Sequence, residues 1–275
     1  MTTKEILEYL AKRVPIENLP LNWDATGYTT EDFNQYVVTD DFKGWEGDRP
    51  DTYEVETIVK LLGVRRGETL LDIACGYGRH ALLLGEKHGL SVIGIDISPG
   101  LIQAAKKRAA NTKNGVSFEV MHARDIRWQD EFGHAIVVFN SFSLFSPQDA
   151  PLVLKAVNRA LKPQGRLFMD LDNKPFNCRY GTRDTKWYTL PDSLLLQDVF
   201  FHEDISVEVI RDIYFTAGTK HVEEFVCLKR IYLRQEIEEL LSRNGFTISA
   251  TYGDWDLSPL SNSSPKMLIT ARKPE

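Results

Sequence analysis

Cysteine is scarce in this chain, and its spacing carries no chemistry. The 275 residues hold three cysteines, Cys75, Cys178 and Cys227, which are odd in number and far apart. This excludes a disulfide framework and the ligand spacing of a zinc site, and the six histidines add no metal-binding pattern. We therefore expect no metal, and the low cysteine usage favours a cytoplasmic protein.

Long apolar runs and an excess of basic charge are absent too. No stretch approaches the roughly 18 apolar residues of a membrane-spanning helix, and the first residues lack a signal-peptide pattern. The formal net charge of -6 and the isoelectric point near 5.6 disfavour a broad phosphate-binding surface. We expect neither a nucleic-acid nor a membrane partner.

The chain divides into an irregular beginning and a long regular region. Residues 1–50 combine a short helical pattern with aromatic, irregular sequence, and we interpret them as an N-terminal cap. Such a segment either covers a pocket as a lid or packs on the core as an arm, and the sequence leaves both possibilities open. Residues 51–275 are predicted to form one large domain.

Short apolar runs alternate with amphipathic helical patterns in the first part of that domain. Strands that alternate with helices indicate an α/β fold with a doubly wound, mostly parallel sheet. The predicted strands are Thr69–Ile73, Ser91–Ile95, Val116–Met121, Ala135–Phe139 and Arg166–Leu171.

The pattern changes after Asp172. Extended alternating runs predict an antiparallel β insertion of about three strands at about 180–233. A helix at Arg234–Arg243 follows, and two last strands are expected to close a seven-stranded sheet as an antiparallel hairpin. The three runs are Ser193–Phe201, Ser206–Phe215 and Glu223–Leu233, and the hairpin strands are Phe246–Tyr252 and Lys266–Ala271.

The strongest functional signal is the stretch from Leu70 to His80, followed by a strand that ends on Asp96. Gly76 and Gly78 let the backbone approach a ligand, and the Asp96 carboxylate can hold both hydroxyls of a ribose. The stretch also satisfies the G-x-G-x-x-A pattern of dinucleotide-binding enzymes, because Ala81 follows and Asp96 lies 18 residues past Gly78. A NAD(P)-dependent oxidoreductase is therefore one alternative.

Two acids favour a different nucleoside. Asp72 stands before the glycines, where it repels a pyrophosphate and attracts the cationic end of an amino acid. Asp125, in the stretch 122–126, can accept a hydrogen bond from the exocyclic amine of an adenine. The Lys-Pro-Gln-Gly stretch at 162–165 and the final helix, Gly-Phe and hairpin complete the pattern.

In this combination of motifs the chain resembles the class I S-adenosylmethionine-dependent methyltransferases over about residues 50–275. It is most similar to members that act on small molecules and carry a β insertion after strand five. The resemblance implies a Rossmann-like fold, S-adenosyl-L-methionine as the cofactor, and transfer of a methyl group to nitrogen or oxygen of a small-molecule acceptor. A non-catalytic nucleoside-binding or sensor protein is a second alternative, and the sequence predicts no oligomeric state.

The resemblance also assigns roles to individual residues. Ala74 stands where many members carry the first glycine of the turn, so we expect crowding there but not loss of binding. Ile97 is expected to pack on the adenine, and Asp125 with the backbone near Ile126 to read its edge. The cofactor-binding residues so implied are Asp72, Ala74, Cys75, Gly76, Gly78, Asp96, Ile97, Asp125, Ile126 and Asn140.

Catalytic residues are harder to predict, because methyl transfer needs little from the protein. Asn140, at the end of the fourth strand, lies where the transferred methyl group is expected to point. It lacks the prolines that follow this position in amino-methylating nucleic-acid enzymes, which disfavours a nucleic-acid substrate. His202 and Tyr28 are candidate bases because they fall in segments that could form a lid.

Overall fold

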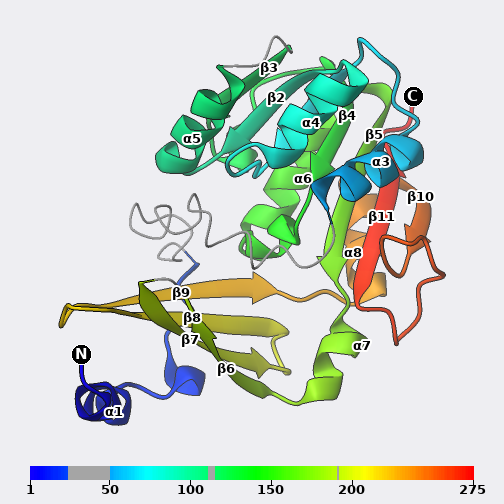
Figure 1. Cartoon of the computed structure of the whole chain (residues 1–275). Helices are drawn as coiled ribbons and strands as arrows, with labels where there is room; N and C mark the ends of the chain where they lie inside the picture. Colours follow the sequence, from blue (N-terminus) through cyan, green and yellow to red (C-terminus); the bar gives the residue numbers. More distant parts are fainter. Residues whose placement is uncertain (24–49, 111–114, 191) are drawn as a thin grey trace.

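The structure is a computed structural model that describes residues 1–23, 50–110, 115–190 and 192–275. It contains two sheets, which Figure 1 shows one above the other, with α7 (Lys174–Asn177) on the connection between them. The seven-stranded sheet has the order β10-β11-β5-β4-β1-β2-β3. Its strands are β1 Thr69–Ile73, β2 Ser91–Asp96, β3 Val116–Val120, β4 Phe132–Val137, β5 Leu161–Asp172, β10 Thr247–Tyr252 and β11 Lys266–Arg272.

This large sheet has the predicted topology. Neighbours among β1 to β5 pair in parallel, and β11 is antiparallel to both β5 and β10. Strand β1 is buried over four of its five residues, as expected for a strand that helices cover on both faces. β5 begins at Leu161, earlier than predicted, because the 162–165 stretch continues the strand.

Helices cover both faces of the large sheet and enclose its two hydrophobic cores. The first core includes residues of α3, α4 and α5, and the second includes residues of α6 and α8. Ser98 caps α5, accepting a hydrogen bond from the backbone of Leu101 with Pro99 in the first turn. These helices are α3 Asp51–Leu62, α4 Arg79–His88, α5 Pro99–Ala109, α6 Asp149–Ala160 and α8 Arg234–Arg243.

The insertion forms a separate sheet of four antiparallel strands, in the order β6-β7-β8-β9. The prediction of about three strands was wrong, because β6 is a largely exposed edge strand without an apolar alternation. The strands are β6 Arg183–Thr189, β7 Ser193–His202, β8 Val207–Thr216 and β9 Val222–Arg230. We call this the second sheet.

The described part of the N-terminal segment packs on one face of the second sheet. Helix α1 (Thr3–Lys12) contacts the apolar cluster around Leu196 and Ile213, and the short helix η1 (Ile16–Asn18) buries Ile16 against Val209. Residues 1–23 therefore pack on the second sheet as an arm. Tyr28 and the rest of the predicted cap lie outside the described residues.

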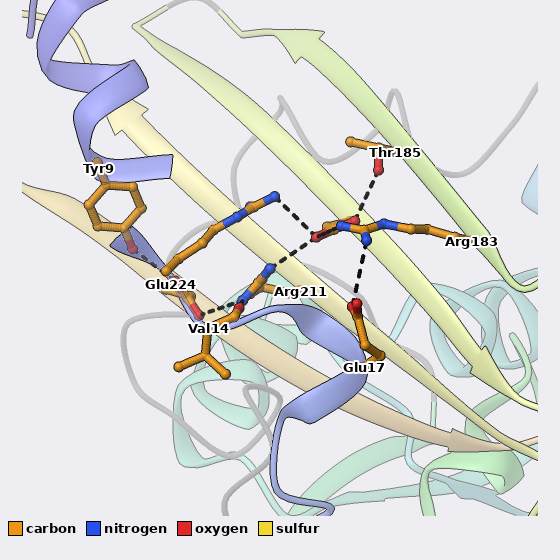
Figure 2. A network of polar contacts seen from close by, with 9 residues as sticks. Tyr9, Val14, Glu17, Arg183, Thr185, Arg211 and Glu224 are labelled. Atoms are coloured by element: carbon orange, nitrogen blue, oxygen red, sulfur yellow. Dashed lines mark hydrogen bonds and ion pairs between the residues drawn. The ribbon is translucent and has the colours of Figure 1, made fainter. Parts of the chain in front are cut away.

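A buried ion network fastens this arm to the sheet (Figure 2). The Asp198 carboxylate accepts hydrogen bonds from Arg13 at 3.2 Å, Arg211 at 3.0 Å and Thr185 at 3.0 Å. Arg211 also donates to the backbone carbonyl of Val14 at 2.7 Å. Asp198 and Arg211 are almost completely buried, so the contacts between the arm and the sheet depend on this ion pair.

The chain contains no helix, among the described residues, that is long and apolar enough to cross a membrane.

Candidate functional site

The turn between β1 and α4 is shaped by backbone that few side chains tolerate. Ala74, Gly76 and Gly78 all have positive φ, at 55°, 56° and 80°. A Cβ on Gly78 would lie 2.4 Å from the Phe118 ring, so this glycine is required for close packing. A Cβ on Gly76 would meet nothing within 4 Å, which leaves open space above the turn. The turn thus combines a strained backbone with room for a ligand.

Asp96 ends β2 directly beside this turn. One carboxylate oxygen accepts from the backbone N–H of Gly76 and the other from that of Ser98, both at 2.9 Å. Burial raises the pKa of Asp96, and these backbone donors oppose the rise. Each oxygen retains a further lone pair, so the carboxylate is held in place and can still accept from two hydroxyl groups.

Asp72, near the end of β1, is a buried acid without a complete set of partners. It is 3% exposed, and its Oδ2 atom has no hydrogen-bond partner among the described residues. Burial raises the pKa of Asp72 to about 7, although His80 and Arg79 nearby favour its charged form. A buried carboxylate of this kind is stabilised by a cation that enters the site.

Two pairs of residues beside the turn escaped the sequence analysis. Arg79 donates to Asp51 at 2.6 Å and lies over the Phe139 ring, 4.6 Å from its centroid. His80 bonds to Glu54 at 2.8 Å, and both are buried. The sequence did indicate one residue of each pair, because Arg79 and His80 directly follow Gly78 in the glycine turn. Their partners come from α3, and only the packing of α3 against α4 brings them together.

The same residues include a group with the geometry of a metal site. Ligand atoms of Asp51, Glu54 and His80 all lie within 4.8 Å of one another. In this structure, however, Asp51 is paired with Arg79 and Glu54 with His80. The cationic Arg79 disfavours a metal ion beside it, so we assign no metal to this group.

The three residues predicted to lie near the adenine have different surroundings in the structure. Ile97 is 44% exposed directly after Asp96, as expected of an apolar residue that packs on a planar ligand. Asp125 has a side chain that is 68% exposed and lines a groove with residues of α6, including Leu152. Ile126 is fully buried in the core. Contact of Asp125 and of the Ile126 backbone with the adenine stays a prediction.

His122 is the polar side chain that follows β3 beside Asp96. The backbone N–H of the preceding Met121 bonds to the Asp96 carbonyl at 2.9 Å, which places this part of the chain next to β2. The His122 ring accepts from the Arg124 backbone at 3.1 Å, and burial lowers its pKa, so it is neutral at pH 7. Its position directly after the predicted strand Val116–Met121 is a signal that the sequence analysis passed over.

Asn140 lies at the end of β4, in a strained turn. Phe139 and Asn140 both have positive φ, at 63° and 55°. The Asn140 side chain donates to Asp172 at 2.6 Å and accepts from the Asp172 backbone at 3.1 Å and from Ser143 at 2.6 Å. This network favours a role in fixing the ends of β4 and β5, which was the alternative to direct action on a nucleophile.

The Asn140 network continues into further charged groups. Lys266 of β11 donates to Asp172 at 2.7 Å and lies 3.9 Å from Asp170. Burial alone would raise the pKa of Asp172, but Lys266 and Lys229 hold it below its ordinary value. Asp170 has a raised pKa because it is buried, and its Oδ1 atom has no partner among the described residues.

Two other predicted groups are poorly placed for catalysis. His202 shares a face of β7 with Phe200, and that face of the sheet carries the arm formed by α1 and η1. The expectation that His202 acts as a base is therefore not supported by its position. Cys75 is buried, and burial raises the pKa of its thiol well above the ordinary value, so it is no nucleophile at neutral pH.

Comparisons with known proteins bear on this site. A family model described as a methyltransferase domain matches residues 70–165. The chain is 31% identical over 153 residues to O-methyltransferase rstn1 of Aspergillus nomiae, which covers 49% of this chain and 67% of that protein. It is 31% identical over 111 residues to phosphoethanolamine N-methyltransferase 1 of Zea mays, covering 40% of this chain and 22% of that protein.

The chain therefore spans a small part of several relatives that it matches, since three further plant phosphoethanolamine N-methyltransferases are also covered over 22% of their length. Among solved structures, the CcbJ methyltransferase of Streptomyces caelestis aligns over 92% of this chain and 100% of that chain. The TM-score is 0.76 at 16% identity, which establishes the similarity of the folds.

Proposed function

Because the chain belongs to the class I S-adenosylmethionine-dependent methyltransferase family, we propose that it transfers a methyl group from S-adenosylmethionine to nitrogen or oxygen of a small molecule. The observation that carries this proposal is that two carboxylates, those of Asp96 and Asp72, both lie beside the glycine turn. One carboxylate is held in place by two backbone donors, and the other is buried with an unpartnered oxygen. The hydroxyls of a ribose match the first carboxylate, and an ammonium group matches the second.

The residues around the turn account for the parts of the cofactor. Asp96 accepts from the ribose hydroxyls, and Asp72 takes the methionine ammonium as the partner that it lacks. We add Arg79, whose guanidinium is oriented by Asp51 and can bind the methionine carboxylate. Ile97 offers its exposed apolar surface to the adenine. Acids at both ends make a pyrophosphate a poor fit, which disfavours a dinucleotide.

The chemistry needs positioning more than proton transfer. The cofactor supplies a methyl carbon bonded to a positively charged sulfur, which is already a good leaving group. Holding an acceptor in line with that carbon can contribute on the order of 7–11 kcal/mol through orientation alone. Here the Asn140–Asp172–Lys266 network keeps the ends of β4 and β5 rigid where the acceptor must lie. Phe139, which is exposed beside it, can exclude water once a ligand is bound.

Ligand binding tests the proposal directly. S-adenosylhomocysteine should raise the melting temperature of the full chain and give a saturable calorimetric signal, whereas NAD and NADP should do neither. Asp96→Asn should weaken S-adenosylhomocysteine binding roughly 10- to 100-fold, since a charged acceptor of two hydroxyl bonds is lost. Asparagine is preferred to alanine because its amide oxygen can keep one of the two backbone contacts, to Gly76 or to Ser98.

Asp184→Asn is the matched control, because it makes the same change at an exposed acid of the second sheet. It should change binding less than twofold. Binding of NAD in place of S-adenosylhomocysteine would overturn the proposal in favour of an oxidoreductase. Binding without methyl consumption over a broad panel of acceptors would instead indicate a sensor protein.

A further inference from the structure

One face of the second sheet carries polar groups that the fold does not require. Cross-strand partners share a face, so Gln197 stands beside Asp212, and Glu208 stands beside Lys229. Gln197 donates to Asp212 at 3.0 Å, and Lys229 lies 3.9 Å from Glu208. We call this the inner face. The opposite, outer face carries Asp198 and Arg211 and is covered by α1 and η1.

The inner face meets the part of the chain that contains the large sheet and the glycine turn, which we call the nucleoside domain. Leu195 and Tyr214 of this face pack against Tyr77 in the glycine turn and Leu101 of α5. At the other end of the face, Glu208 and Lys229 interact electrostatically with Asp172, the residue that holds Asn140. The polar pairs of the inner face therefore lie toward the carboxyl ends of β1 and β5, where an acceptor must approach the methyl group.

This region has an excess of negative charge. Four carboxyl groups that interact with one another or with the same lysines face two ammonium groups: Asp170, Asp172, Glu208 and Asp212 against Lys229 and Lys266. Glu54, which also interacts with Asp170, is paired with His80. Burial raises the pKa of Asp170 and Glu208, and that of Asp212 to about 6. A positive charge on a ligand would stabilise the ionised form of these carboxylates.

Two carboxylates of this region are incompletely partnered, although Lys266 lies 3.9 Å from the first of them, Asp170. Asp170 is 1% exposed, and one of its oxygens has no hydrogen-bond partner among the described residues. The Asp212 carboxylate has Gln197, a neutral amide, as its only hydrogen-bond partner in the described part of the chain. Asp212 thus differs from Asp198 and Glu208 of the same sheet, which are paired with Arg211 and Lys229.

Resting on the function proposed above, we propose that the methyl acceptor is an amine, and that its ammonium form binds to Asp212 on the inner face of the second sheet. Glu208, already paired with Lys229, borders the same ligand. Between the two polar pairs the inner face presents Val199, Ile210 and Cys227, which match an apolar portion of the acceptor next to its nitrogen. A neutral hydroxyl acceptor would leave Asp212 without its counter-charge.

The reaction balances with these groups. The bound ammonium transfers one proton to the Asp212 carboxylate, which exposes the nitrogen lone pair. That pair forms the new N–C bond while the C–S bond breaks and its electrons stay on sulfur. The products are the methylated ammonium and S-adenosylhomocysteine, and the proton on Asp212 then passes to water.

Paired compounds test this choice of acceptor. Glucosamine, tyramine and ethanolamine are compared with glucose, tyrosol and ethylene glycol for binding to the full chain saturated with S-adenosylhomocysteine, and for methyl transfer from S-adenosylmethionine. Amines should bind and react in preference to their hydroxyl partners. Asp212→Asn should lower kcat/KM for the best amine on the order of 100-fold, through KM because a charged contact is lost and through kcat because the proton acceptor is lost.

Asp184→Asn is the matched control, since Asp184 lies on the same face of the edge strand but is half exposed and paired with Lys186. It should leave kcat/KM within twofold. S-adenosylhomocysteine binding should be unchanged in both variants, which separates this inference from the proposed function. Equal use of a hydroxyl partner, an unaffected Asp212→Asn enzyme, or no binding of any amine by the saturated protein would each overturn the inference.

Discussion

At the scale of single residues, function and stability oppose each other at Asp72. This carboxylate is buried, and one of its own oxygens has no hydrogen-bond partner among the described residues, so its ionisation destabilises the fold. A cationic ligand can pair with the same carboxylate, which accounts for an acid at this position. Asp96 differs, because two backbone donors satisfy it before any ligand arrives. Cofactor binding should therefore depend on both acids, while Asp72 is the one of the two that has an unpartnered oxygen before the ligand binds.

Asp72→Asn tests this directly. The pKa of Asp72 is raised to about 7, so its ionisation at pH 8 costs the folded state up to roughly 4 kcal/mol. The variant should raise the free energy of unfolding at pH 8 by about 1–3 kcal/mol in urea titrations and have little effect at pH 5. It should also weaken S-adenosylhomocysteine binding at least tenfold. A variant that is less stable at pH 8 would contradict the assignment.

At the scale of elements, the arm formed by α1 and η1 depends on one ion pair. Asp198 is fully buried and balances Arg211, which is 1% exposed, while Arg13 connects the end of α1 to the same carboxylate (Figure 2). Removing one member of a buried pair leaves an uncompensated charge, which is more costly than losing an exposed pair. The arm and the second sheet should therefore be stabilised as a unit.

Asp198→Asn should destabilise that unit by about 3–5 kcal/mol and speed hydrogen exchange in α1. Asp184→Asn, at an exposed pair with Lys186, should cost less than about 1 kcal/mol. Urea unfolding with hydrogen exchange measures both effects. Equal losses in the two variants would show that the Asp198 network contributes no more than a surface ion pair.

At the scale of the whole molecule, the buried acids set an unusual dependence of stability on pH. Burial raises the pKa of Asp72 to about 7 and of Asp212 to about 6, and raises those of Asp96, Asp170 and Glu208. Between pH 4 and 7 the folded chain then binds more protons at these groups than the unfolded chain. Their contribution to the free energy of unfolding falls as the pH rises through that window.

The ligand-free protein should accordingly be more stable near pH 6 than at pH 8, while S-adenosylhomocysteine should bind more tightly at pH 8, where Asp72 is ionised. Thermal unfolding at both pH values, with and without S-adenosylhomocysteine, measures the two trends. Acids with exposed partners, such as Glu119 beside Arg127, have lowered pKa values and act in the opposite sense. A stability that rises steadily from pH 6 to 8 would show that those groups dominate.

The sequence by itself determined the parts of this protein whose partners are close along the chain. The glycine turn and Asp96 belong to one strand–helix–strand unit, and alternating apolar runs predict the parallel sheet and the seven strands. Only the tertiary structure decided the rest. Asp51 pairs with Arg79, Lys266 with Asp172, and the outer face of the second sheet turns His202 away from the site.

The physical reason lies in how each kind of information is encoded. Strand alternation separates the residues of β7 and β8 into two faces, but it does not specify which face meets the nucleoside domain. That choice follows from packing between distant segments, here Ile16 on the outer face and Tyr77 with Leu101 on the inner face. Whether a buried acid is balanced likewise depends on which cations the fold brings to it.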